Sequence, residues 1–195
     1  ARWFDFIAPL LFPQYHIVAL DLPGMGDSDW LEHYSREIMA EAVIETVRQS
    51  GFDSKPALVA HSFGGMIGVV ASHLYGNELA ATLICDYISP PPEYHEEWYS
   101  DRDNSPPTRI YKTKEEALQR FRLMPEQPCE NEFIIDYIGD LSIRDLNQDD
   151  GIIRDGRRED GFTWKFDNNI YDGFVVGSDL AEKWQALKMP LAYMF

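Results

Sequence analysis

The chain has 195 residues, of which 45% are hydrophobic and 13% aromatic, enough for the core of one domain or of one domain with an insertion. Its formal net charge is −16, from 33 acidic and 17 basic residues. A surface of that sign repels nucleic acid and anionic membranes, so we expect neither as a partner. A neutral or apolar substrate fits this charge better than an anionic one.

The cysteines and the chain start bear on the compartment. Cys85 lies in an apolar run typical of a buried strand, and Cys129 is the only other cysteine, so a disulfide framework is not expected. No apolar run reaches the roughly 18 residues that span a bilayer. No signal peptide is recognised, and we expect a cytoplasmic protein. The sequence opens at Ala1 inside a predicted helix, so we expect the true N-terminus upstream.

The first elements along the chain are a helix, a strand and a turn. Apolar residues at helical spacing predict a helix over residues 1–11, ended by Pro13. His16–Leu20 is a short apolar run and predicts a buried strand. The segment Asp21–Ser28 contains two glycines and a proline, which predict a turn after it.

Alternating strands and helices come next. Ser35 is placed to cap a helix that Gly51 ends, with its core face at Met39, Ala42, Val43, Thr46 and Val47. Residues 57–60 and 79–85 predict buried strands on either side of a helix over residues 64–74. This alternation predicts an α/β fold, a mostly parallel sheet with helices on both faces.

The pattern changes after residue 88. Three prolines, Pro90 to Pro92, stop the strand, and the next ninety or so residues are too long for a simple crossover. Helices are predicted over residues 114–123 and 132–141. We interpret residues 89–178 as a largely helical lid inserted into the core.

The predicted division of the chain follows from this. Residues 1–88 form the first part of the core, and residues 179–195 return to it. The return consists of a helix over residues 179–187 and a strand over residues 190–195, in which the chain ends.

The segment Val59–Gly65 carries the most informative pattern. A predicted buried strand runs directly into Ser62, and a helix opens with small residues immediately after it. This is the context of a nucleophile elbow, a turn so tight that the serine is strained and its hydroxyl exposed. Residues two before and two after must be small to avoid collision, and they are Ala60 and Gly64.

The turn would activate Ser62 in two ways. At a helix N-terminus, unpaired N–H groups and the helix dipole favour developing negative charge. The main-chain N–H of Phe63 is placed to donate to an oxyanion. The pattern therefore predicts a serine nucleophile.

Two further motifs accompany the elbow. Asp21–Ser28 resembles the D-x-P-G-x-G-x-S loop of the α/β-hydrolase family, and Phe162–Asp167 is similar to the W-x-F-D segment at the end of the lid in many members. The three motifs occur in the family's order, and the resemblance covers essentially the whole chain. It implies acyl transfer from a substrate carbonyl to Ser62 and then to water.

The resemblance also implies parts that this sequence does not contain. Family members carry a His-Gly motif just before the first helix, which supplies a second oxyanion donor. They carry a catalytic aspartate after the strand that here ends at Phe195, and a histidine further on. We therefore expect the chain to be the central portion of a longer enzyme, truncated at both ends.

The histidines present do not match the family's base. His16, His33, His61, His73 and His95 all lie elsewhere. His61 adjoins Ser62, but neighbouring side chains at such a turn point in different directions, so a packing role is expected. His73 lies about three turns along the next helix, and His95 lies in the predicted lid.

Asp86 is the remaining candidate for catalysis. It ends the strand after the elbow, and in some family members the triad acid comes from that strand; a structural aspartate there is the more common case. Asp149, Asp150 and Asp155 miss the spacing of a calcium loop, and neither a metal nor a cofactor is expected.

The predicted function is hydrolysis of small, apolar carboxylic esters. Aromatic lid residues could line the pocket for such a small-molecule substrate, namely Trp98, Tyr99, Phe121, Tyr137, Trp164 and Phe166. Hydrolysis of a carbon–carbon bond by the same serine is one alternative, and a non-catalytic binding protein of the same fold is another. Monomer and homodimer are both left open.

Overall fold

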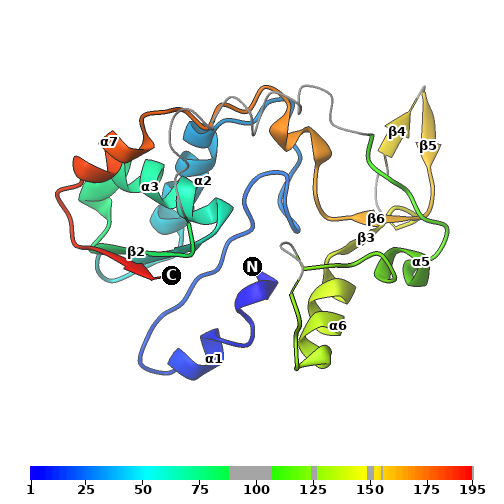
Figure 1. Cartoon of the computed structure of the whole chain (residues 1–195), viewed down its shortest axis with the longest axis horizontal. Coiled ribbons are helices and arrows are strands. Elements are labelled where there is room, and N and C mark those ends of the chain that lie inside the picture. Colours follow the sequence, from blue (N-terminus) through cyan, green and yellow to red (C-terminus); the bar gives the residue numbers. More distant parts are fainter. Residues whose placement is uncertain (88–106, 124–126, 149–151, 155, 195) are drawn as a thin grey trace. The chain divides into compact units, whose positions relative to one another are not determined.

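The computed structural model describes residues 1–87, 107–123, 127–148, 152–154 and 156–194. Contacts divide the chain into two units (Figure 1). Unit 1 comprises residues 1–30 and 106–168, and unit 2 comprises residues 31–105 and 169–195. The predicted division into a core and a lid uses other boundaries and stays a prediction.

Unit 2 is built on a parallel sheet, as predicted. Its strands are β1 (Ala57–His61), β2 (Ala81–Cys85) and β7 (Leu191–Met194), in the order β1-β2-β7. The last pair of β1 and β2 is His61 with Cys85, and Cys85 in turn pairs with Met194. Because parallel strands end at the same edge, the residues that follow β1 and β2 lie side by side there.

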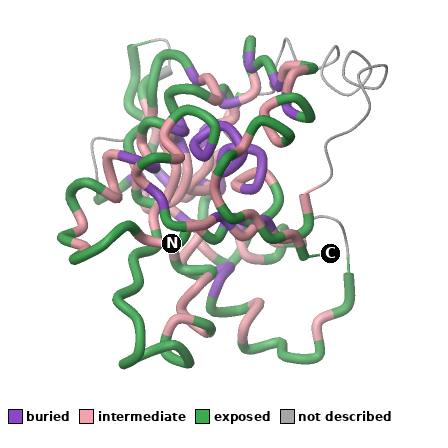
Figure 2. Tube along the Cα trace, turned by 90° about the vertical axis from the view of Figure 1, so that its left-hand side faces the viewer, coloured by how far each residue is buried: buried purple, intermediate pink, exposed green. Residues whose placement is uncertain are grey.

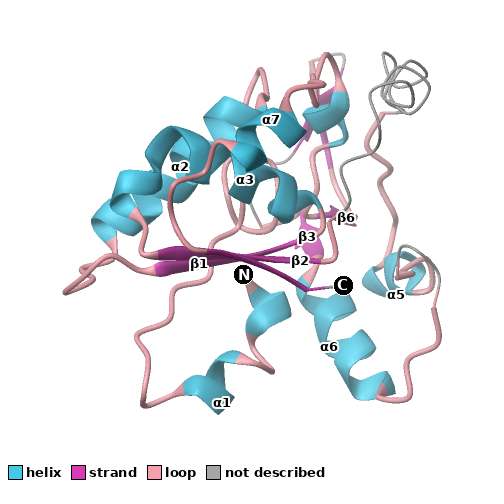
Figure 3. Ribbon diagram, turned by 60° about the vertical axis from the view of Figure 1, so that its left-hand side comes forward, coloured by secondary structure: helices cyan, strands magenta, loops and turns pink. Residues whose placement is uncertain are grey.

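Three helices pack on one face of this sheet, namely α2 (Arg36–Gln49), α3 (Phe63–Tyr75) and α7 (Leu180–Gln185) (Figure 3). The short 3-10 helix η2 (Gly76–Glu78) follows α3. Both predicted ends of α2 are confirmed. The Ser35 hydroxyl accepts the Ile38 N–H at 3.1 Å, and Gly51 has the positive φ, 66°, that ends a helix readily.

The centre of unit 2 is α3, in which every residue from Gly65 to Ser72 is buried (purple in Figure 2). The buried residues of α2 are Met39, Ala40, Val43 and Ile44, so its core face is only partly the predicted one. On the sheet face away from these helices, Val59 is 51% exposed. Helical cover on that second face therefore stays a prediction.

The N-terminal segment differs from both predictions made for it. Instead of one helix over residues 1–11 there are two short pieces, η1 (Arg2–Phe4) and α1 (Ala8–Leu11). Pro9 explains the break, because a proline is tolerated in the first turn of a helix but lacks the N–H that an interior position needs. The strand predicted over residues 16–20 is wrong. Those residues are irregular and mostly exposed, and no described strand pairs with them.

The rest of unit 1 combines short helices with short antiparallel strands. The helices are α5 (Lys114–Leu118), shorter than predicted, and α6 (Glu132–Leu141), which matches the predicted bounds. The strands were not predicted: β3 (Ile143–Asp145) pairs with β6 (Phe162–Trp164), and β4 (Ile152–Arg154) with β5 (Arg157–Glu159). Its core gathers Tyr111, Ala117 and Ile143 with the partly buried Leu118, Phe162 and Trp164.

Candidate active site

Ser62 occupies a strained turn between β1 and α3. Its backbone angles are φ 52° and ψ −124°, and its side chain is exposed. A residue with a Cβ rarely adopts a positive φ, and such strain persists only where the surrounding structure imposes it. The predicted strand–turn–helix geometry is therefore present. The role of Ser62 as nucleophile stays a prediction.

Main-chain hydrogen bonds fix this turn to the sheet and to the helix. The Ser62 N–H donates to the Cys85 carbonyl at 3.0 Å. The Ser62 carbonyl accepts the N–H groups of Gly65 at 2.8 Å and Met66 at 3.3 Å. Because the first N–H groups of a helix have no partner within it, the Phe63 N–H at the first position of α3 is free of intrahelical bonding. It lies where an oxyanion donor is expected.

The glycines that are packed closely behind the turn are Gly65 and Gly68, and not Gly64 as predicted. A Cβ on Gly64 would meet nothing within 4 Å, so collision does not explain that glycine. A Cβ on Gly65 would lie 2.7 Å from the Tyr87 Cβ, and one on Gly68 would lie 2.9 Å from the Ala60 Cβ. The small residues let α3 approach the sheet closely, and Ala60 is small because it faces Gly68.

Asp86 stands beside Ser62 on the next strand. It follows Cys85 directly, has a φ of 48°, and donates its N–H to the Met194 carbonyl at 2.8 Å. Among the described residues other than glycine, only Ser62 and Asp86 have a positive φ. The structure thus brings the three candidate residues, Ser62, Phe63 and Asp86, to one edge of the sheet, while leaving their chemical roles as predictions.

Two histidines of unit 2 can be placed relative to Ser62. His61 is exposed and follows the buried Ala60, so its side chain lies on the sheet face away from α3, since successive strand residues alternate. His73 is exposed on α3, about 16 Å along the helix axis from Ser62 at the usual rise per residue. His95 lies outside the described residues.

An aromatic cluster adjoins the nucleophile position. The Phe63 ring contacts the rings of Tyr171 and Phe174, with centroids 6.1 and 5.7 Å apart. Tyr171 ends the 3-10 helix η4 (Asn168–Tyr171) and is half-buried, and Phe174 is 5% exposed. Sequence reasoning missed this pair. The three-residue spacing of Tyr171 and Phe174, directly before the predicted return to the core, was the available signal.

Four of the six aromatic residues that were predicted to line a pocket lie in unit 1, and the other two are not described. Phe121, Tyr137, Trp164 and Phe166 belong to unit 1, where Phe121 and Trp164 pack together with ring centroids 5.9 Å apart. Trp98 and Tyr99 lie outside the described residues. A lining role for these six residues stays a prediction.

An ion pair anchors the segment that carries Tyr171 and Phe174. The Arg36 guanidinium donates to the Val176 carbonyl at 2.7 Å and to the two Asp179 carboxylate oxygens at 2.5 and 3.1 Å. Lys183 also contacts the Asp179 carboxylate. Hydrogen bonds from Arg36 and Lys183 hold the pKa of Asp179 well below its usual range. Gly177 has a φ of 77° and leaves no room for a side chain beside Arg36.

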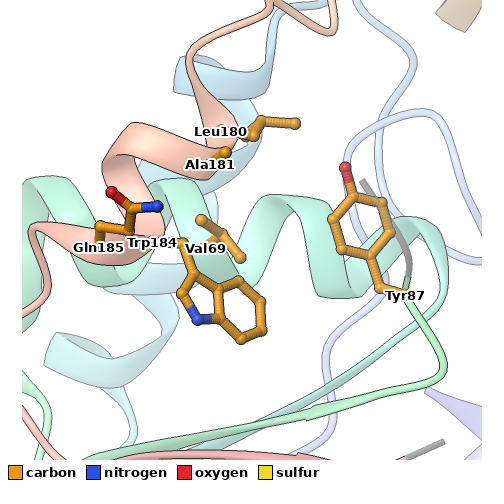
Figure 4. Close-up of a pocket in the computed structure, with 6 residues that line it drawn as sticks. All are labelled: Val69, Tyr87, Leu180, Ala181, Trp184 and Gln185. Carbon is orange, nitrogen blue, oxygen red and sulfur yellow. The ribbon is translucent and has the colours of Figure 1, made fainter. Parts of the chain in front are cut away.

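Unit 2 also contains a cavity of about 210 Å³ between α3 and α7. Figure 4 shows the Tyr87 ring across it from the side chains of α7. Its lining residues are Val69, Tyr87, Leu180, Ala181, Trp184 and Gln185. Because none of Ser62, Phe63 and Asp86 is among them, we do not assign the substrate to this cavity.

In unit 1, the two other motifs of the sequence pair with each other. The Gly26 N–H donates to the Lys165 carbonyl at 2.9 Å, and the Asp167 N–H donates to the Gly24 carbonyl at 2.8 Å. Met25 and Phe166 form an antiparallel bridge between these bonds. The positive φ values of Gly24 and Gly26, 78° and 58°, shape the turn. Two motifs about 140 residues apart therefore form one structure.

The described residues contain neither a helix suited to a membrane nor a cluster of metal ligands. Among the helices that the structure describes, none is long and apolar enough to cross a membrane. Across the same residues, no group of three His, Cys, Asp or Glu side chains could hold a metal ion. Asp149, Asp150 and Asp155, the loosely calcium-like segment, lie outside the described residues.

Comparison with known proteins identifies the class. The sequence model of the alpha/beta hydrolase fold matches residues 1–124, more than half of the chain. The chain belongs to this hydrolase-fold family, as the three motifs predicted. No protein of curated function matches the sequence significantly.

Solved structures agree with the fold. An E-2-(acetamidomethylene)succinate hydrolase is similar over 98% of this chain and 67% of its own, with 16% identity and a TM-score of 0.73. The thioesterase domain from the curacin biosynthetic pathway is similar over 98% and 69%, with 18% identity and a TM-score of 0.65. An esterase of M. tuberculosis is similar over 89% and 56%, with 17% identity and a TM-score of 0.66. The chain thus spans about two thirds of the first two structures.

Proposed function

We propose that the protein is a serine hydrolase that cleaves small, neutral carboxylic esters through an acyl-enzyme on Ser62. The observation that carries the proposal is the positive φ of Ser62, 52°, at the carboxyl edge of a parallel sheet and the start of α3. This conformation costs free energy and persists only where the surrounding fold imposes it, and it exposes a hydroxyl at a helix N-terminus. Family membership and the hydrolases among the similar structures support the same class.

The proposed reaction has two steps. The Ser62 Oγ attacks the ester carbonyl carbon while a histidine base takes its proton, and the Phe63 N–H donates to the oxygen that becomes negative. The tetrahedral species collapses, and the alcohol leaves with the proton from the base. Water then attacks the acyl-enzyme in the same way, which releases the carboxylic acid and restores the Ser62 hydroxyl.

Asp86 is proposed as an alternative to the family's downstream aspartate for the carboxylate that orients the base. Its support is position: it directly follows Cys85, whose carbonyl accepts the Ser62 N–H, and its carboxylate is exposed at the same edge of the sheet. The strained backbone of Asp86, with a φ of 48°, gives a second reason to look for a role there.

A hydrolysis assay tests the proposal. Purified protein of natural length is incubated with p-nitrophenyl acetate and butyrate, and release of nitrophenolate is followed. We expect turnover with a burst equal to the enzyme concentration, and none for Ser62→Ala. A folded protein that binds the esters without cleaving them would instead favour the non-catalytic alternative. No observation on the structure favours carbon–carbon bond cleavage.

A further inference from the structure

Phe63, the residue after the nucleophile position, contacts two aromatic rings of a distant segment. Phe63 contacts Tyr171 edge to face, at an interplanar angle of 86°, and contacts Phe174 at 46°. The Phe63–Tyr171 pair has the favourable edge-to-face geometry, and the Phe63–Phe174 pair is tilted. All three residues belong to unit 2, together with Ser62.

The segment that supplies these rings is fixed in place. Ile170, Phe174 and Val176 are at most 5% exposed. The Arg36 guanidinium then binds the Val176 carbonyl and Asp179 at the end of the segment. Tyr171 is therefore held by buried neighbours on its own segment and by an ion pair to α2.

The three aromatic residues differ in how far they are exposed to solvent. Phe174 is buried, while Phe63 and Tyr171 are half-buried residues. Phe63 directly follows Ser62 at the start of α3, so its ring and the Tyr171 ring belong to the immediate surroundings of the nucleophile position. An aromatic face there favours an apolar group and gives no partner to a charged one.

We propose that Tyr171 is a specificity-determining residue, which with Phe63 forms an apolar wall limiting the length of the acyl group beside Ser62. The inference rests on the proposed function, because it assumes that Ser62 is acylated. It deepens that function by naming the substrate class: neutral esters with a short acyl group.

The test compares, for each variant, the rate constants of inactivation by two reagents that differ in chain length. Purified protein of natural length is inactivated with two uncharged fluorophosphonates, one with an ethyl and one with an octyl chain, and the two second-order rate constants are compared. Removing the Tyr171 ring in Tyr171→Ala should raise the octyl-to-ethyl ratio about tenfold, the order of discrimination that an apolar pocket achieves. Because both rates come from one preparation, partial unfolding does not alter the ratio.

Two variants serve as matched controls. Tyr171→Phe keeps the ring and should keep the wild-type ratio. Val175→Ala trims a side chain of the same segment that is 70% exposed, and should also keep it. If the octyl-to-ethyl ratio of Tyr171→Ala stays within twofold of the wild-type ratio while Ser62 is still labelled, Tyr171 does not limit the length of the acyl group. The proposed function then stands. If wild-type protein is not labelled at Ser62, the proposed function is wrong, and so is the role proposed for Tyr171.

Discussion

The Ser62 N–H donates at 3.0 Å to the carbonyl of Cys85, the β2 residue that pairs with His61 at the end of β1. This bond continues the parallel ladder into the turn and holds the strained Ser62 backbone against the neighbouring strand. It also sets Asp86, the residue after Cys85, beside the nucleophile position. The candidate site is thus built by the sheet edge itself.

The carboxylate of Asp86 can be separated from its backbone conformation. Asp86→Asn keeps a side chain that tolerates a positive φ but removes the charge, and Asp86→Gly removes the strain as well. If the carboxylate orients the base, both variants should hydrolyse p-nitrophenyl acetate at a rate reduced by about 10³-fold or more while remaining folded. Full activity in Asp86→Asn would show that Asp86 shapes the turn and that its carboxylate has no part in catalysis.

The glycines of α3 should differ sharply in their tolerance of a methyl group. Gly65→Ala and Gly68→Ala place a Cβ within 3 Å of Tyr87 and Ala60 respectively, so each should lower the free energy of unfolding by about 1–3 kcal/mol. Gly64→Ala is the matched control, because its Cβ meets nothing within 4 Å and alanine favours helix. Urea unfolding measures all three. Equal losses at the three positions would contradict the packing described.

The Arg36–Asp179 pair should give a pH-dependent stability. Asp179 is 37% exposed, so water screens the pair, and Asp179→Asn should cost about 1 kcal/mol at pH 7. Because the pKa of Asp179 is lowered in the folded protein, this contribution is present above the unfolded-state pKa of about 3.9. It is lost as the pH falls below that value towards the folded-state pKa.

Unfolding of wild type and Asp179→Asn, measured from pH 7 down to pH 3, checks this. The difference between them should shrink below about pH 4. Glu182→Gln, on the exposed side of α7, is the control and should show no such trend. A difference that grows with acid would mean that Asp179 is not a stabilising anion.

The paired motifs of unit 1 predict a strict need for glycine at one position. A Cβ on Gly26 would overlap the Asp21 carboxylate, whose residue also accepts the Asp27 N–H at 3.2 Å and the Ser28 hydroxyl at 2.6 Å. Gly26→Ala should therefore cost about 2–4 kcal/mol in urea unfolding, through strain and crowding together. Gly156→Ala shares the positive φ, 73°, but has open space, and should cost only the strain, about 1 kcal/mol. Equal losses in the free energy of unfolding would contradict the crowding of a Cβ at Gly26 by Asp21.

Local signals in the sequence were enough for several elements. The cap at Ser35, the helix end at Gly51 and the bounds of α6 depend on residues within a few positions of each other, and these predictions are confirmed. The strained turn at Ser62 is of the same kind, because a strand, a serine and small residues are contiguous.

Features that depend on distant residues were missed or wrong. A strand needs a partner, and the apolar run over residues 16–20 has none among the described strands. The close approach at Gly65 and Gly68, rather than at Gly64, depends on Tyr87 and Ala60, which only the folded sheet brings near. The contact of Phe63 with Tyr171 joins residues more than a hundred positions apart. The helix break at Pro9 depends on a local signal, but the prediction of one helix over residues 1–11 did not take it into account.

Covalent labelling of Ser62 tests the central claim most directly. Purified protein of natural length is treated with a small fluorophosphonate, digested, and the modified residue is located by mass spectrometry, with Ser62→Ala and Ser72→Ala in parallel. Ser72 is a buried serine of α3, hydrogen-bonded to Thr82 at 2.7 Å, and serves as the control. The account predicts stoichiometric modification of Ser62 in wild type and in folded Ser72→Ala, and none in Ser62→Ala. Folded wild-type protein that is unlabelled, or labelled equally in Ser62→Ala, would contradict it.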